Sequence, residues 1–158
     1  MKIGTTLFLK ISIILIGIPV LLLSLGAIPW LFSHPVIPIY SGIIYPIIVG
    51  LYFTSIPFYI ALFNGFKLLN YIDKNIAFSD ISVRTLKNIR SCAISICLIY
   101  TLIMPFVYLL ADKDDAPGLI IMGMIPLFAS LVVAVFSAVL QKLLQEAIII
   151  KLDNDLTV

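Results

Sequence analysis

The chain has 158 residues, of which 62% are hydrophobic and only 11% are charged, and its formal net charge is +2. So few charges exclude a water-soluble globular domain, in which about 25% of residues are usually charged. The small net charge also argues against direct binding of nucleic acid, so we expect the lipid bilayer to surround most of the chain.

The first apolar segment covers residues 11–32 and contains no charged residue. At about 1.5 Å per helical residue it is long enough to cross ~30 Å of hydrocarbon. Lys2 and Lys10 precede it, as basic residues precede the apolar part of a signal peptide. The segment is too long for such a peptide and no A-x-A cleavage motif follows, so we expect a retained transmembrane helix.

Three more uncharged segments repeat this pattern, at residues 43–63, 91–111 and 119–140. Each is long enough to span the bilayer as a helix, the structure that satisfies its own backbone hydrogen bonds in lipid. The sequence therefore predicts an all-α, polytopic membrane protein. We expect one domain over residues 1–158, a bundle of four transmembrane helices with cytoplasmic helical extensions.

The basic residues predict the orientation of these helices. Nine of the ten lie in the N-terminal segment, in residues 64–90 or in residues 141–158, and Lys113 alone lies in the two remaining loops. Short loops rich in Lys and Arg stay in the cytoplasm. We therefore expect a multi-pass protein of the cell membrane, with both termini, the 64–90 loop and the 141–158 tail in the cytoplasm.

The cytoplasmic loop is expected to hold two helical extensions. The second helix should run past Lys67 and break near residues 73–75, and the third should begin below the membrane. Ser79 or Asp80 is expected to cap the third helix with a side-chain oxygen, and Asp80 is spaced to pair with Arg84. The fourth helix should continue from residue 141, whereas residues 153–158 are predicted to form an exposed peptide.

Small residues at helical spacing predict where the helices approach one another closely. Ser130, Ala134 and Ala138 form such a stripe on the fourth helix, and Ser91 and Ser95 do so on the third. Stripes of this kind let helix backbones pack together in lipid. They are compatible with homo-oligomers as well as with packing inside one chain.

Residues suited to catalysis or metal binding are scarce. The four predicted spans contain no Asp, Glu, Lys, Arg or His, and the one histidine, His34, lies in an outer loop. Asp112, Asp114 and Asp115 lack the ligand spacing and glycine of a calcium loop, so we interpret them as a solvated turn. We expect no enzyme activity, no cofactor, no metal site and no catalytic residue.

Short motifs in the cytoplasmic parts resemble the YoaS-like bacterial membrane proteins, a family known only as a domain of unknown function. The resemblance rests on Phe78-Ser79, on Val83, Leu86, Lys87 and Ile89 that follow, and on the terminal residues Asp155, Leu156, Thr157 and Val158. It covers essentially the whole chain, including the number and length of the helices. Ser82 departs from the pattern, because the family commonly has Asn there.

The resemblance implies a neighbouring gene for a small helix-turn-helix regulator, which would make the cytoplasmic face a docking site for this DNA-binding protein. We therefore predict a protein that acts through protein contacts, such as restraint of that cytosolic regulator. The alternatives are a small transporter or channel subunit, and an immunity protein against a membrane-active peptide. The candidate partner-contact residues are Phe78, Ser79, Arg84, Lys87, Asp155, Leu156, Thr157 and Val158.

Overall fold

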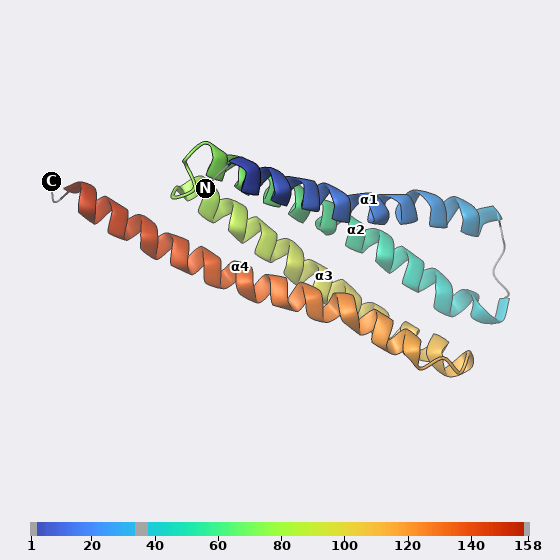
Figure 1. The fold of residues 1–158 in the computed structure, drawn as a ribbon. Helices are drawn as coiled ribbons and strands as arrows, with labels where there is room; N and C mark the ends of the chain where they lie inside the picture. Colours follow the sequence, from blue (N-terminus) through green and yellow to red (C-terminus); the bar gives the residue numbers. More distant parts are fainter. Residues whose placement is uncertain (1–2, 34–37, 157–158) are drawn as a thin grey trace.

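The computed structural model describes residues 3–33 and 38–156, and all regular structure in these ranges is helical. The four helices are α1 (Ile3–Ser33), α2 (Pro38–Asp73), α3 (Asp80–Lys113) and α4 (Gly118–Leu156) (Figure 1). Each is long and apolar enough to cross a membrane, which confirms the predicted all-α fold with four candidate spans. Each predicted span falls within one helix.

Two connections contain, two residues after a helix ends, a left-handed residue that turns the chain. Asn75, with φ 60°, follows the end of α2, and Asp115, with φ 52°, follows the end of α3. Asn and Asp adopt this conformation more readily than other residues with a side chain. The predicted break near residues 73–75 and the start of the third helix below its span are therefore confirmed.

The prediction that a side-chain oxygen caps α3 is wrong. Ser79 occupies the N-cap position with extended backbone angles, but its side chain makes no capping hydrogen bond. Its hydroxyl instead donates to the carbonyl of Ile76, three residues earlier in the connection, at 2.6 Å. The predicted pair between Asp80 and Arg84 does not form either, as no ion pair joins these residues in the described chain.

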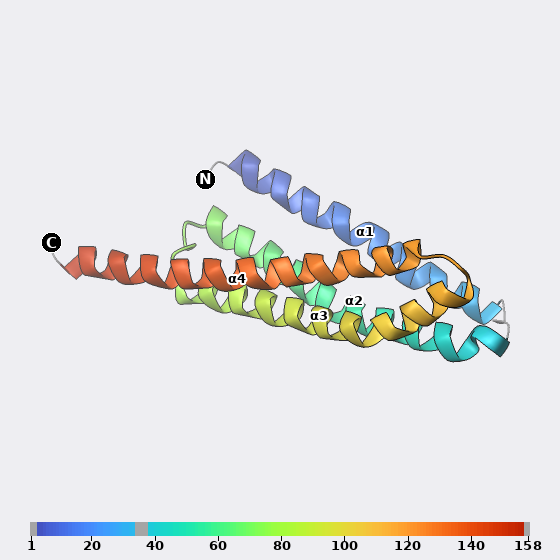
Figure 2. The same cartoon turned by 90° about the horizontal axis from the view of Figure 1, so that it is seen from below.

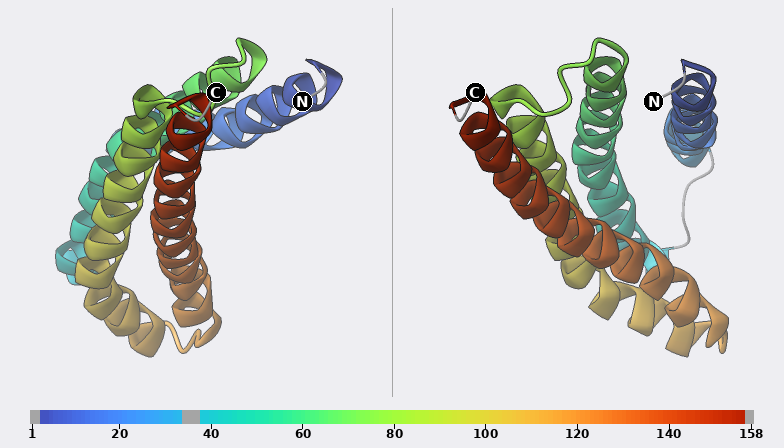
Figure 3. Two further views of the ribbon diagram at one scale, coloured as in Figure 1. Left: turned by 90° about the vertical axis from the view of Figure 1, so that its left-hand side faces the viewer. Right: turned by 60° about the vertical axis from the view of Figure 1, so that its left-hand side comes forward.

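The helices form an open row and not a closed bundle. α2 packs on α3 and α3 packs on α4, whereas α1 packs on α2 alone. Among the described residues, no Cα atom of α1 lies within 8 Å of one in α3 or α4. Figure 2 shows α1 separating from α2 and α3 toward its N-terminal end. Figure 3 shows α1 diverging from α4 in the same direction.

Glycine and small polar residues allow the close approach of α2, α3 and α4. A Cβ atom on Gly50 would lie 2.5 Å from Ile103 Cδ1, and one on Gly123 would lie 3.0 Å from Met104 Sδ. Ser130 and Ala134 are buried as the stripe on α4 predicted, and Ser137 is buried as well, whereas Ala138 is only half-buried. Close helix contact in lipid requires such small side chains.

The predicted Ser91 and Ser95 stripe on α3 does not pack against another helix of the described chain. Both side chains are exposed, and their hydroxyls donate to carbonyls one turn earlier in their own helix. Cys92 and Ala93 are the residues of this turn that are buried. The helix is rotated so that its small apolar residues, and not its serines, meet the neighbouring helices.

α4 is longer than the sequence predicted. It remains helical through Leu156, so residues 153–156 extend the helix and are not an irregular peptide, although they are exposed as expected. Ile148 is half-buried, and every described residue from Ile149 onward is exposed. In Figure 1 the C-terminal end of α4 extends past the beginning of α3.

Candidate functional site

The first group of predicted partner-contact residues lies at the α2–α3 connection and the start of α3. Phe78 is 56% exposed although it is a large apolar side chain. Ser79 is half-buried, and Arg84 and Lys87 are exposed on α3. This part of the chain therefore presents an exposed aromatic ring on the connection and two exposed basic side chains on α3.

The second group lies at the end of α4. Asp155 is exposed and Leu156 is 84% exposed, while Thr157 and Val158 lie outside the described residues. Both groups are at the end of the molecule where Figure 1 marks the N- and C-termini. The described chain shows no hydrogen bond or ion pair between the two groups, and the end of α4 extends past the beginning of α3 (Figure 1), so the structure places them at the same end without bringing them together.

An ion pair that the sequence did not predict ties α1 to α2 at the same end. Lys10 Nζ lies 2.8 Å from Asp73 Oδ2, with the two side chains 19% and 24% exposed. The ammonium also lies 5.4 Å from the centroid of the Phe66 ring. Lys10 therefore spans from the edge of the predicted first span to the last residue of α2, as long basic side chains do at membrane boundaries.

Ser82, the position where the resemblance implies Asn, is fully buried. Its hydroxyl lies 3.4 Å from the Ile76 carbonyl and 3.5 Å from the Ser79 hydroxyl. The two serines thus converge on one carbonyl of the connection between α2 and α3. This cluster holds the loop against the first turn of α3 and makes Ser82 a structural residue.

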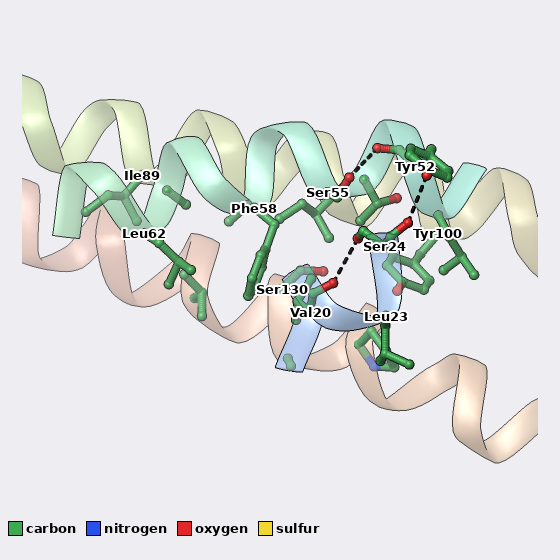
Figure 4. Close-up of a pocket in the computed structure, with 18 of the residues that line it drawn as sticks. Val20, Leu23, Ser24, Tyr52, Ser55, Phe58, Leu62, Ile89, Tyr100 and Ser130 are labelled. Atoms are coloured by element: carbon green, nitrogen blue, oxygen red, sulfur yellow. Dashed lines mark hydrogen bonds between the residues drawn. The ribbon is translucent and has the colours of Figure 1, made fainter. Parts of the chain in front are cut away.

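A cavity of about 730 Å³ lies between the four helices. Figure 4 shows Phe58 and Leu62 from α2, Leu23 from α1 and Tyr100 from α3 around it. α4 contributes Ser130 and its neighbours to the same wall. The volume lies within the roughly 300–1,000 Å³ of ordinary ligand sites.

The polar groups of this cavity are largely satisfied by the protein itself. Ser24 donates to the Val20 carbonyl at 2.8 Å and Tyr52 donates to the Ser24 carbonyl at 2.8 Å (Figure 4). Ser130 donates to the Leu127 carbonyl and Thr54 to the Gly50 carbonyl, both at 2.8 Å. With these hydroxyls engaged by helix carbonyls, the cavity suits an apolar occupant.

No arrangement typical of a catalytic or metal centre accompanies the cavity. No charged side chain lines it, and within the described ranges no three His, Cys, Asp or Glu residues come together as metal ligands. Cys92 and Cys97 are free thiols. The chemistry at hand is therefore apolar contact in the interior and charged or apolar contact at the end surface.

Sequence reasoning missed both the Lys10–Asp73 pair and the cavity. The pair joins residues 63 positions apart, and only the register of the α1–α2 hairpin brings them together. One signal was available: Asp73 is the first acidic residue of the chain, and antiparallel helices place it opposite the beginning of α1. The cavity has no such signal, since it depends on how the helices cross.

Comparison with known proteins gives relatives but no activity. Residues 30–158 match the family described as "Protein of unknown function (DUF2975)", so the match begins near the end of α1. The chain is also 54% identical over 156 residues, covering 98% of each chain, to the "Uncharacterized membrane protein YoaS" of Bacillus subtilis (strain 168). No solved structure matches the chain.

Proposed function

Because the chain belongs to the DUF2975 family of proteins of unknown function, we propose that it is a multi-pass protein of the bacterial cell membrane that acts through protein contacts and not by catalysis. The contact surface is the end of the molecule that carries both termini, on the cytoplasmic side of the membrane. The single observation that supports this proposal is the exposed apolar extension of α4, residues 141–156.

This extension is too long to be needed for crossing the bilayer. α4 has 39 residues, a helix of about 58 Å, whereas the hydrocarbon core is ~30 Å thick. Residues 141–156 follow the predicted span and add about 24 Å of helix. An extension of this length reaches well past the lipid into the aqueous phase.

The side chains on the extension favour a protein partner over water. Leu143, Ile149, Ile150 and Leu152 are each more than half exposed. Burying a Leu or Ile side chain fully contributes about 1.5–3 kcal/mol. Covering these four residues would therefore stabilise a complex, and charged residues such as Lys142 and Glu146 beside them would keep the free helix soluble.

The proposed partner is a cytosolic DNA-binding regulator held at the membrane. Arg84 and Lys87 are exposed near the start of α3 and favour an acidic surface on that partner. A regulator's DNA-binding face is basic, so it would be repelled by these residues and the contact would use another face. Restraint then comes from keeping the regulator at the membrane, away from its operator.

A deletion strain tests this proposal through its transcripts. We expect deletion to alter a narrow set of transcripts, and expression of the wild-type chain to restore them. A chain with Ile149→Glu and Ile150→Glu should reach the membrane at wild-type levels but fail to restore the set, because two charges replace the apolar contact. Gln145→Glu, on the same exposed part of α4, is the matched control and should restore it.

Two results would contradict the proposal. One is an unchanged transcript profile after deletion. The other is full restoration by the double Glu variant at equal membrane levels, since the exposed apolar extension would then have no role in signalling. Transport and immunity against a membrane-active peptide stay predictions with no contact in the structure that favours either.

A further inference from the structure

The interhelical cavity has dimensions that restrict its occupant. Its lining runs from Ile48 to Gly65 along α2, a length of about 25 Å at ~1.5 Å per residue. Its volume of about 730 Å³ is spread along that length, so the cavity is long and narrow. A single extended hydrocarbon chain fits along it.

The cavity is accessible from the side. α1 and α4 both contribute lining residues, yet no Cα atoms of these two helices approach within 8 Å in the described chain. Figure 3 shows α1 and α4 diverging toward the N-terminal end of α1. A chain from the surrounding lipid can thus enter between α1 and α4 without unfolding any helix.

Charge distinguishes the two ends of the cavity. At the end lined by Ile13, Gly65 and Ile89, the basic residue Arg90 follows Ile89 by one position. Lys67, two positions after Gly65, lies on the other side of α2, with its ammonium 4.7 Å from the centroid of the Phe63 ring. At the other end, near Leu23 and Pro126, no charged residue occurs for more than one helical turn in either direction along α1 or α4. An anionic group attached to the hydrocarbon chain would therefore be stabilised at the Arg90 end alone.

We propose that the cavity binds one acyl chain of an anionic phospholipid, which enters between α1 and α4 and places its headgroup at Arg90. The half-thickness of the hydrocarbon core, about 15 Å, is shorter than the cavity, so a chain from one leaflet fits along its length. The apolar lining contributes affinity and Arg90 gives headgroup preference. This lipid site is independent of the partner contact at the α4 extension.

Native mass spectrometry tests the proposal on the full chain. The protein is extracted in mild detergent from vesicles of equal phosphatidylglycerol and phosphatidylcholine with identical acyl chains. We expect the wild type to retain one phosphatidylglycerol. Ala129→Trp fills the cavity from α4 and should reduce retention at least about tenfold, the effect of ~1.4 kcal/mol. Val132→Trp, on the same helix but outside the lining, is the matched control and should retain the lipid.

Arg90→Gln tests the headgroup position separately. This variant should still retain one phospholipid but choose equally between phosphatidylglycerol and phosphatidylcholine. Absence of lipid on the wild type, equal retention by Ala129→Trp and Val132→Trp, or an unchanged headgroup preference in Arg90→Gln would each overturn the proposal as stated.

A fluorescence measurement keeps the proposal testable if the Ala129→Trp chain does not fold. Trp30 is the single tryptophan, so Trp30→Phe combined with Tyr100→Trp places the one indole in the cavity lining. The chain is placed in vesicles whose phosphatidylglycerol carries brominated acyl chains. We expect bromine to quench the fluorescence of the Trp at position 100 as strongly as it quenches a Trp placed at position 132, which faces the lipid. Emission that bromine leaves unchanged would overturn the proposal.

Discussion

Two serines of α3 show how differently the same side chain can be placed on one membrane helix. Ser82 is fully buried against the α2–α3 connection and shares the Ile76 carbonyl with Ser79. Ser91, nine residues later, is exposed and donates to the Lys87 carbonyl at 3.1 Å. The side chain of Ser82 is enclosed by other atoms, whereas the side chain of Ser91 has open space around it. The same substitution should therefore change the free energy of unfolding differently at the two positions.

We expect Ser82→Leu to lower the free energy of unfolding by about 1–3 kcal/mol, the usual cost of overpacking a filled position. Ser91→Leu should change it by no more than about 0.5 kcal/mol, because an exposed substitution meets no neighbour. Reversible unfolding in mixed detergent micelles measures both values. Equal destabilisation by the two variants would contradict the rotation of α3 described above.

At the scale of elements, the contacts of α2, α3 and α4 depend on positions without side chains. Gly50 faces Ile103, which is 5% exposed and therefore cannot move aside freely. Gly26 on α1 has no atom within 4 Å of where its Cβ would stand. The difference agrees with the packing of the row, in which α1 contacts only α2.

The pair Gly50→Ala and Gly26→Ala tests this packing. Alanine favours a helix by about 1 kcal/mol over glycine, so Gly26→Ala should leave the free energy of unfolding unchanged or raise it. Gly50→Ala should instead lower it by about 1 kcal/mol, because overpacking costs ~1–3 kcal/mol and exceeds the gain in helix propensity. Thermal unfolding followed by circular dichroism compares them. A stabilised Gly50→Ala chain would show that α2 and α3 do not meet as closely as described.

At the scale of the whole molecule, most of the charged residues lie at one end, and four, Asp112, Lys113, Asp114 and Asp115, lie at the other. The N-terminus, the α2–α3 connection and the end of α4 lie together, and the Lys10–Asp73 pair joins α1 to α2 there (Figure 1). The α3–α4 connection, with Asp114 and Asp115, lies at the opposite end. From the distribution of Lys and Arg we predict that the first end lies in the cytoplasm.

Cysteine labelling checks this orientation. In a chain with Cys92→Ala and Cys97→Ala, which removes both native thiols, Asp114→Cys should react with a membrane-impermeant maleimide in intact cells. Lys87→Cys should react only after the cells are lysed. Both positions are exposed, so access to the reagent is decided by the membrane and not by burial. The reverse pattern would invert the proposed partner surface.

The sequence by itself determined that the chain has four apolar helices, and it located the break after Asp73 and the start of α3. These features are local: about 20 uncharged residues are needed to cross lipid, and turns follow from residues such as Asn75 and Asp115. The exposure of Phe78, Arg84 and Lys87 was also predictable, since charged and loop residues lie outside the lipid.

Only the tertiary structure decided which faces of the helices meet. It buried Cys92 and Ala93 in place of Ser91 and Ser95, paired Lys10 with Asp73, and left a cavity between α1 and α4. In water an apolar stripe identifies the buried face of a helix. These helices are apolar on every side because lipid and protein neighbours are equally apolar, so their rotation and crossing depend on packing that no single segment encodes.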